Sequence, residues 1–227
     1  MSQIETPVEP RTADTLRVLL VDDHDLFRTG LRNLLEEQGV NVVAEAGTGL
    51  EAIQCVREHA PDVVVMDLNM PGMTGVEATR HIASVSPLTR VLVLTISDQD
   101  GDVMDAIMAG ACGYLLKDAS IQELMRGIEA AAVGEALISP HIAAKVLQRL
   151  RAASTEPDLE RTIRAELSDR ELQVLKLIAN GKDNNQIAAE LHISPKTVKN
   201  HISNILMKLQ IGNRIQAAVY AVKSGLV

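Results

Sequence analysis

Five polar residues of this chain stand where short apolar runs end, and together they could perform phosphoryl chemistry. These residues are Asp22, Asp23, Asp67, Thr95 and Lys117. Runs of about four branched residues suit strands that are buried on both faces of a parallel sheet. In open sheets of this kind, ligands bind at the carboxyl ends of the strands, so we expect the five side chains to meet at that edge.

Three carboxylates at one edge call for a cation between them, because like charges repel strongly in a partly desolvated cleft. Ligands that are all oxygens select a hard ion such as Mg²⁺, which favours a phosphate oxygen as a further partner. Lys117 adds a positive charge for a phosphoryl group, and the Thr95 hydroxyl adds a hydrogen bond. Asp67 is then the expected nucleophile, and its product is an acyl phosphate. For any one of Asp22, Asp23 and Asp67, the polar start of a loop is the better interpretation; only the set of five positions favours this chemistry.

Strand and helix patterns alternate across the first half of the chain and would position these residues. Strands are predicted at 17–22, 41–46, 62–67, 90–95 and 113–116. Helices are predicted at 25–38, 49–60, 74–85, 100–110 and 119–132. This alternation predicts right-handed βαβ crossovers and an α/β fold, in which a five-stranded, doubly wound parallel sheet is covered by helices on both faces.

Only helical patterns follow the predicted sheet. An amphipathic segment is predicted at 139–151, and periodicity is then lost over a linker at about 152–166. Four helices are predicted after it, at 168–181, 184–191, 194–209 and from 213 onward. The first opens with a Ser168–Glu171 capping box, and the two that follow fit a helix-turn-helix. The chain therefore ends in a small, all-α four-helix domain.

The charge of the chain is divided between these two parts. The 227 residues leave room for two domains, and the formal net charge is −8. From Glu166 onward there are eight Lys/Arg and five acids, which gives +3, so the residues before it carry −11. An acidic first part and a basic end indicate two domains with different partners, and favour a polyanion as the partner of the second.

Two cysteines, Cys55 and Cys112, have no metal-ligand spacing around them and indicate a reduced, cytoplasmic protein. Residues 1–15 carry prolines and acids, so a disordered tail is expected there instead of a signal peptide. No apolar run approaches the roughly 20 residues that cross a bilayer. We therefore expect a soluble protein with no membrane partner.

The segment 194–209 has one apolar and one polar face. Its apolar stripe contains Val198, Ile202, Ile205, Leu206 and Leu209. Lys196, Lys199, Asn200 and Ser203 point the other way. Exposed cations and amides suit a helix that enters the DNA major groove, although an ordinary solvated face fits the charge equally well. Lys182 and Lys208 are candidates for phosphate contacts.

Residues 17–132 resemble a response-regulator receiver domain, which has a flavodoxin/CheY-like fold. The matching motifs are Asp22-Asp23, Asp67 followed by Leu68-Asn69-Met70-Pro71-Gly72, Thr95, and Lys117 preceded by Tyr114. The resemblance implies that Asp67 takes phosphate from a histidine kinase and that Asp23 binds Mg²⁺ beside it. It also implies that Asp22 supports the water shell of the metal and that Asn69 offers its backbone carbonyl. By the same resemblance Thr95 and Lys117 hold the phosphoryl group, and Tyr114 is a switch that swings inward.

Residues 166–227 resemble the LuxR-type helix-turn-helix of NarL/FixJ regulators. The matching stretches are Leu167-Ser168-Asp169-Arg170-Glu171, Asn185-Gln186-Ile187-Ala188 and Ser194-Pro195-Lys196-Thr197-Val198-Lys199-Asn200-His201. The resemblance implies that Lys199, Asn200 and Ser203 face bases, and Thr197 is counted among the DNA contacts. Relatives commonly carry a longer basic residue where Ser203 stands. The last helix, around Ala217 and Ala221, would support dimerisation on DNA.

The sequence thus predicts a phosphorylation-controlled transcription regulator that binds double-stranded DNA as a homodimer. Its predicted divisions are a tail at 1–15, a receiver domain at 16–135, a linker helix and linker at 136–166, and a DNA-binding domain at 167–227. Opposite charges on the two domains are compatible with a resting receiver that covers the recognition helix.

Three other functions fit parts of the sequence less well. An aspartyl-phosphate hydrolase usually has a second acid two residues after its nucleophile, where this chain has Asn69. An adaptor would use the basic end to bind protein, and a steep loss of DNA binding with salt would count against it. A small-molecule sensor would need an apolar pocket in place of the acidic cleft.

Overall fold

The computed structural model describes residues 15–138, 142, 146, 163 and 166–227, and the description below concerns these residues. Six parallel strands form one sheet in the order β2-β1-β3-β4-β5-β6. The strands are β1 (Arg17–Val21), β2 (Asn41–Ala46), β3 (Val63–Met66), β4 (Arg90–Thr95), β5 (Gly113–Leu116) and β6 (Leu137–Ile138). The helices between them are α1 (Asp25–Glu37), α2 (Gly49–His59), α3 (Gly75–Val85), α4 (Asp100–Ala109) and α5 (Ile121–Ala132).

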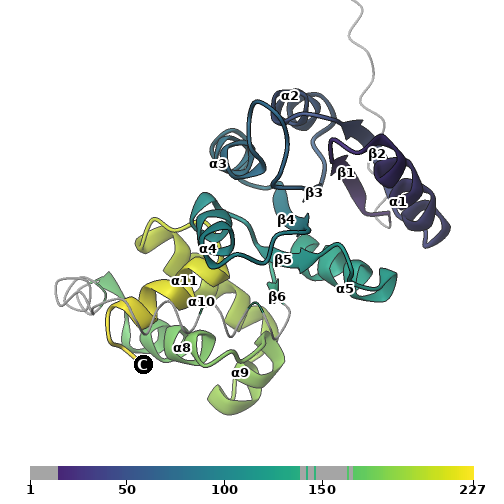
Figure 1. Cartoon of the computed structure of the whole chain (residues 1–227). Coiled ribbons are helices and arrows are strands. Elements are labelled where there is room, and N and C mark those ends of the chain that lie inside the picture. The colour runs from purple at the N-terminus through teal and green to yellow at the C-terminus, as the bar shows by residue number, and fades with distance from the viewer. Residues whose placement is uncertain (1–14, 139–141, 143–145, 147–162, 164–165) are drawn as a thin grey trace, which may run out of the picture.

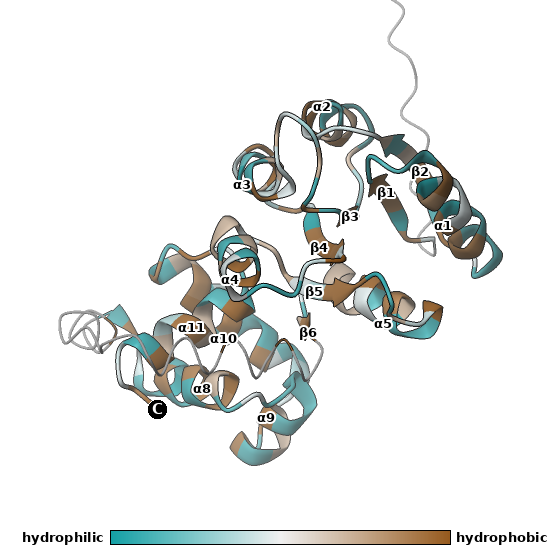
Figure 2. Ribbon diagram, in the orientation of Figure 1, coloured by the Kyte–Doolittle hydropathy of each residue, from teal (hydrophilic) through white to brown (hydrophobic). Residues whose placement is uncertain are grey.

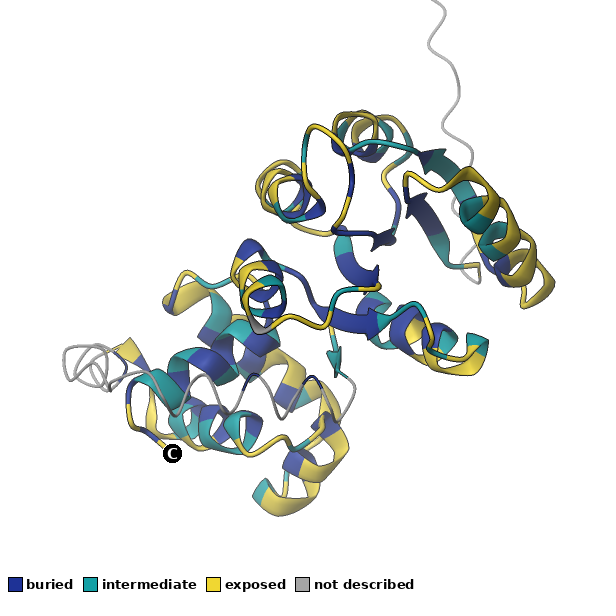
Figure 3. Cartoon of the chain, in the orientation of Figure 1, coloured by how far each residue is buried: buried dark blue, intermediate teal, exposed yellow. Residues whose placement is uncertain are grey.

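Alternate side chains of each strand belong to different helical layers, because successive residues of a strand point to opposite faces of the sheet. In β3, Val63 and Val65 pack in the cluster that contains Leu35 of α1 and Ile128 of α5. Val64 and Met66 belong instead to the cluster built with α2 and α3. Figure 3 shows the buried central strands between helices whose outer faces are exposed. The doubly wound α/β prediction is therefore confirmed.

The predicted number of strands was one too low. The short strand β6 pairs with β5, through Gly113 with Leu137 and Tyr114 with Ile138. It lies inside the segment that was expected to be a linker, 136–166. Two residues are too few to display a strand period, so the pattern did not reveal it. The predicted tail at 1–15 and the helix at 139–151 lie largely outside the described residues.

Four helices follow: α8 (Asp169–Ala179), α9 (Asn184–Leu191), α10 (Pro195–Lys208) and α11 (Arg214–Lys223). Each begins at a side-chain cap, provided by Ser168, Asp183, Ser194 and Asn213. The predicted Ser168–Glu171 capping box is present. The apolar faces of the four helices enclose a core of their own, and their polar faces turn outward (Figure 2). None of the described helices is long and apolar enough to cross a membrane.

Helix α11 also packs against the sheet domain, beside α4 (Figure 1). Ile215 and Val219 of α11 share an apolar cluster with Val103 and Ile107 of α4. Tyr114 of β5 belongs to the same cluster. The apolar cluster that surrounds Tyr114 is thus shared between the two domains.

Candidate functional site

The two buried acids of the predicted site meet because their strands are neighbours. β1 and β3 pair in register, with Val21 opposite Met66, so the residue after each strand is Asp22 or Asp67. Both acids are buried, with 5 % and 2 % of their surface exposed. The carboxylates therefore lie at the carboxyl edge of the sheet, as predicted.

Lys117 joins these two carboxylates. Its Nζ lies 2.6 Å from Asp22 Oδ2 and 2.7 Å from Asp67 Oδ2. The ammonium group also lies 4.7 Å from the centre of the Phe27 ring, a distance that suits a cation–π contact. Burial lowers the pKa of Lys117, but the hydrogen bonds that it donates to Asp22 and Asp67 outweigh this effect, so the pKa is raised overall. The lysine is a fixed positive charge beside Asp67.

Backbone groups hold the other oxygen of Asp67. Its Oδ1 accepts hydrogen bonds from the amides of Leu68 at 2.7 Å and Asn69 at 3.4 Å. Gly75 lies close behind the same residue, because a Cβ there would be 2.0 Å from the carbonyl oxygen of Asp67. The carboxylate is therefore fixed by Lys117 on one oxygen and by the turn that follows β3 on the other.

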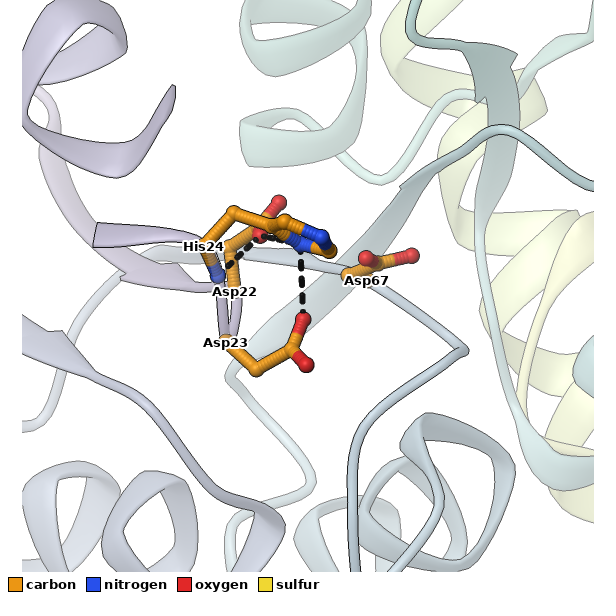
Figure 4. A group of neighbouring side chains, drawn as sticks. All are labelled: Asp22, Asp23, His24 and Asp67. Atoms are coloured by element: carbon orange, nitrogen blue, oxygen red, sulfur yellow. Dashed lines mark hydrogen bonds and ion pairs between the residues drawn. The ribbon is translucent and has the colours of Figure 1, made fainter. Parts of the chain in front are cut away.

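A histidine completes the acidic cluster, and the sequence analysis did not single it out. Asp22, Asp23, His24 and Asp67 each offer one ligand atom, and these atoms lie within 4.8 Å of one another (Figure 4). His24 Nδ1 is 2.8 Å from Asp23 Oδ1 and 3.2 Å from Asp22 Oδ1. The three carboxylates alone suit Mg²⁺, which prefers oxygen ligands. The place of His24 directly after the acidic pair was the one signal that could have revealed it.

The predicted switch residues are connected through Ser97. Thr95 is buried, and its hydroxyl accepts a 3.4 Å hydrogen bond from the Ser97 amide. The Tyr114 hydroxyl donates a 2.9 Å hydrogen bond to the Ser97 carbonyl. Burial raises the pKa of Tyr114, with Asp102, Asp98 and Asp67 adding to the effect. Tyr114 is fully buried in this structure and thus already points inward. Lys117 contacts Thr95 through the backbone: the Lys117 amide donates a 2.9 Å hydrogen bond to the Thr95 carbonyl.

The predicted DNA-contact residues fall into two groups. Four of them, Lys196, Lys199, Asn200 and Ser203, are exposed residues of α10. The others have protein partners: Thr197 Oγ1 is 2.8 Å from Ser194 Oγ, Lys182 Nζ is 3.0 Å from Glu190, and Lys208 Nζ is 2.7 Å from the buried Glu171. The polar face of α10 is therefore available to a ligand, whereas the Lys208 ammonium is bound to a carboxylate of its own domain.

Two hypotheses about the C-terminal domain can be compared with its packing in this structure. The last helix, around Ala217 and Ala221, was expected to support dimerisation; these two side chains are fully buried in the core of their own domain. Whether a resting receiver covers the recognition helix was left open; in this structure the described residues of the polar face of that helix are exposed. The receiver covers α11 instead, on the side of Ile215 and Val219.

Polar contacts accompany this apolar interface. Asn213 Nδ2 donates to the carbonyl of Ala111 at 3.0 Å, and Gln216 Nε2 donates to the carbonyl of Ile107 at 2.9 Å. Both acceptors belong to the end of α4 or the residues just after it. Because a buried donor such as the Asn213 amide is costly to leave unpaired, the contacts favour one docking position.

A second polar link joins the two domains beside α11. Asn184 donates from Nδ2 to Glu135 at 2.9 Å and accepts from Arg214 at 2.7 Å. Arg214 also donates to the Lys182 carbonyl, and burial lowers the pKa of its guanidinium. Local sequence patterns did not reveal either link, because the partners lie far apart in the chain.

Comparisons with known proteins assign both domains of the chain to known families. Residues 18–129 match the response regulator receiver domain, and residues 165–221 match the luxR family of bacterial regulatory proteins. The transcriptional regulatory protein LiaR of Bacillus subtilis (strain 168) is 45% identical over 214 residues, which cover 93% of this chain and 99% of LiaR. DegU of Brevibacillus brevis is 38% identical over 224 residues, which cover 93% of this chain and 95% of DegU.

Two solved structures cover nearly the whole chain. The response regulator ChrA of a heme-sensing two-component system is 36% identical, with a TM-score of 0.51 over 94% of this chain and 99% of ChrA. A structure of two RcsB dimers bound to two parallel DNAs is 26% identical, with a TM-score of 0.53 over 93% of this chain and 99% of that one.

Proposed function

Because the chain belongs to the two-component response regulators, which regulate transcription through a receiver domain and a LuxR-type DNA-binding domain, we propose that Asp67 is its phosphoacceptor. The observation that carries this assignment is the position of the Asp67 carboxylate. It is buried at the end of β3, with Oδ2 bonded to Lys117 and Oδ1 bonded to backbone amides. A fixed carboxylate beside a fixed positive charge suits nucleophilic attack on a phosphoryl group.

In the proposed step an oxygen of Asp67 forms a bond to phosphorus as the phosphorus–nitrogen bond of a kinase phosphohistidine breaks. The electron pair of that bond stays on the histidine of the kinase, and Asp67 becomes an acyl phosphate. Lys117 stabilises the charge of the phosphoryl oxygens, and Thr95 at the end of β4 supplies a hydroxyl. The residue two places after Asp67 is Asn69, which cannot act as the acid of a phosphatase, so the acyl phosphate serves as a stored signal.

Asp22, Asp23 and Asp67, with the backbone carbonyl of Asn69, would hold Mg²⁺ in this proposal. The fit rests on the donor set, since the three carboxylates gather at one edge and offer only oxygen. When bound, the ion neutralises charge on the phosphoryl oxygens. Asp22 and Asp23 would hold the ion beside Asp67.

Release of α11 from the receiver is the proposed response to phosphorylation. Thr95, Ser97 and Tyr114 are linked by hydrogen bonds, and Tyr114 shares its apolar cluster with Val219 of α11. A shift of the Thr95 hydroxyl toward a phosphoryl group would disturb the Ser97 contact and, through Tyr114, the surface on which α11 docks. Phosphorylation would then shift the equilibrium from the docked toward the released DNA-binding domain.

The released domain would bind double-stranded DNA through the exposed face of α10, as a homodimer. The apolar side of α11 that the receiver covers, around Ile215 and Val219, becomes free for a second copy of the chain. The DNA-bound RcsB dimers support this part of the proposal by relationship. The functional divisions proposed are a receiver at 16–135, a linker at 136–166 whose strand β6 joins the receiver sheet, and a DNA-binding domain at 167–227. The protein is proposed to work in the cytoplasm.

Replacement of Asp67 by asparagine tests the phosphoacceptor. The full chain is treated with a small phosphodonor, and both its intact mass and its DNA affinity at fixed salt are measured. Asp67→Asn should abolish the phosphoryl adduct and the gain in DNA affinity. The control is Asp62→Asn, because Asp62 bonds the Arg17 amide at the amino end of β1, on the opposite edge of the sheet. An adduct that persists in Asp67→Asn would refute the assignment.

A further inference from the structure

His24 stands apart from the rest of the acidic site because it offers nitrogen. Its side chain is 68% exposed, yet Nδ1 faces the Oδ1 atoms of both Asp22 and Asp23, at 3.2 and 2.8 Å. The His24 amide donates to the same Asp22 oxygen at 2.9 Å. The backbone thus fixes the base of the side chain, and the ring lies over the cluster in Figure 4.

These separations match the spacing of adjacent ligands around one ion. Ligands that lie about 2.1 Å from an octahedral ion, at right angles to each other, are about 3 Å apart. The distances from Nδ1 to the two carboxylate oxygens fall on either side of that value. A divalent ion could therefore lie between Nδ1 and the two carboxylate oxygens.

Lys117 does not compete for these atoms. It holds the Oδ2 atoms of Asp22 and Asp67, whereas His24 faces the Oδ1 atoms of Asp22 and Asp23. One side of the cluster is thus closed by the ammonium group, and the other carries oxygen and nitrogen donors together.

We propose that His24 is a direct metal ligand, which raises the affinity of the site for divalent transition ions such as Mn²⁺ relative to Mg²⁺. Mg²⁺ prefers oxygen and keeps several waters, so it gains little from an imidazole. Mn²⁺ and the later transition ions accept imidazole nitrogen together with carboxylate oxygen. The proposal rests on the proposed function, since it assigns a further ligand to the same receiver site.

The test uses the full chain without a polyhistidine tag and two metals, Mg²⁺ and Mn²⁺. Continuous-wave electron paramagnetic resonance measures free and bound Mn²⁺, and Mg²⁺ affinity follows from competition. Pulsed spectra of bound Mn²⁺ report directly whether a nitrogen is coordinated. The wild-type chain should show nitrogen coupling, and His24→Asn should lose it, together with at least about a tenfold loss of Mn²⁺ affinity. Mg²⁺ affinity should change much less.

His81→Asn is the matched control, because His81 is an exposed histidine of α3 whose Nδ1 lies 2.9 Å from the Glu77 carbonyl. It should leave both affinities and the nitrogen coupling unchanged. Absence of nitrogen coupling in wild-type protein, or an equal loss of both metals in His24→Asn, would overturn the role of His24 while leaving the carboxylate site in place. If Asp23→Asn and Asp67→Asn also left metal binding unchanged, the proposed carboxylate site itself would fail.

Discussion

Asn213 donates a hydrogen bond from Nδ2 to the carbonyl oxygen of Ala111, across 102 residues of chain and from one domain to the other. The same side chain caps α11, because its Oδ1 accepts from the Gln216 amide at 2.9 Å. One buried amide thus starts the helix and docks it on the receiver. The two roles use different atoms, so a substitution can separate them.

Asn213→Asp should loosen the docked arrangement while the helix cap remains. Aspartate is as good an N-cap as asparagine, but it brings an acceptor oxygen toward the Ala111 carbonyl. A buried acceptor without a donor costs about 1–3 kcal/mol, so the ratio of docked to released protein should fall by about 5- to 150-fold. DNA affinity without phosphodonor should rise, and small-angle scattering should show a larger radius of gyration.

Asp183→Asn controls for the change of a cap residue, since Asp183 caps α9 by accepting from the Gln186 amide at 2.8 Å. Asp183→Asn should leave both the DNA affinity and the radius of gyration unchanged. Unchanged DNA affinity and radius in Asn213→Asp would contradict the proposal that docking of α11 restrains the DNA-binding domain.

Most of the fold was predictable because its signals are local. The runs before Asp22 and Asp67 are short, apolar and bounded, and such strands at regular spacing leave few topologies. Capping signals are local too, which is why the start of α8 at Ser168 was correct. The two residues of β6 carry no such signal, and their pairing depends on the position of β5.

The site was only partly predictable, because only some of its contacts follow from local sequence signals. The strand ends identified Asp22, Asp67 and Lys117, which meet because parallel strands end at one edge. Lys208, which the sequence assigned to DNA, pairs with Glu171, 37 residues away in the chain. Such contacts depend on how helices pack against one another, so they cannot be predicted from the periodicity of a single segment.

Gly75→Ala should damage the phosphorylation site without altering any of its functional groups. A Cβ at this position would lie 2.0 Å from the Asp67 carbonyl and 2.7 Å from Leu68 Cα, so the end of β3 must move. Overpacking of this kind costs about 1–3 kcal/mol in the free energy of unfolding. Denaturant unfolding should show that loss, and phosphorylation by a small donor should slow.

Gly30→Ala is the control, because nothing lies within 4 Å of a Cβ built at that position of α1. A helical glycine replaced by alanine in open space should gain about 0.5–1 kcal/mol. Wild-type stability and phosphorylation rate in Gly75→Ala would show that the close approach to Asp67 is unimportant.

Glu171→Gln should weaken the C-terminal domain and reduce its sensitivity to acid. Burial raises the pKa of Glu171, but hydrogen bonds from Lys208 and Ser168 outweigh it, so the pKa is lowered overall. A lowered folded-state pKa contributes stability above the ordinary carboxyl pKa, and this stability is lost as the pH falls through the folded value. The stabilisation is therefore complete at neutral pH and is lost below about pH 4.5.

Amide hydrogen exchange of α8 and α10, measured from pH 7 downward, tests this prediction. At neutral pH the variant should be less stable by about 1–3 kcal/mol, and its stability should change less with acid than that of the wild type. Glu123→Gln is the matched control, because Glu123 holds the same capping-box position in α5 but is exposed. Equal effects of the two substitutions on their helices would contradict a special role for the Lys208 pair.

Lys199 and Lys208 should differ in their effect on DNA binding, although both are cations of α10. Lys199 is exposed on the polar face, whereas the Lys208 ammonium lies 2.7 Å from Glu171. A lysine that lies in the major groove neutralises nearby phosphate charge and releases a counterion, even where its ammonium group faces bases. Lys199→Ala should therefore reduce the salt slope of DNA binding by about one unit. Lys208→Ala should leave the slope near that of the wild type and instead destabilise the domain, since it leaves the buried Glu171 without its partner. Fluorescence anisotropy of phosphorylated protein over a range of salt concentrations measures both slopes. If Lys208→Ala reduced the slope and Lys199→Ala did not, the DNA-binding face would have to be reassigned to the C-terminal end of α10.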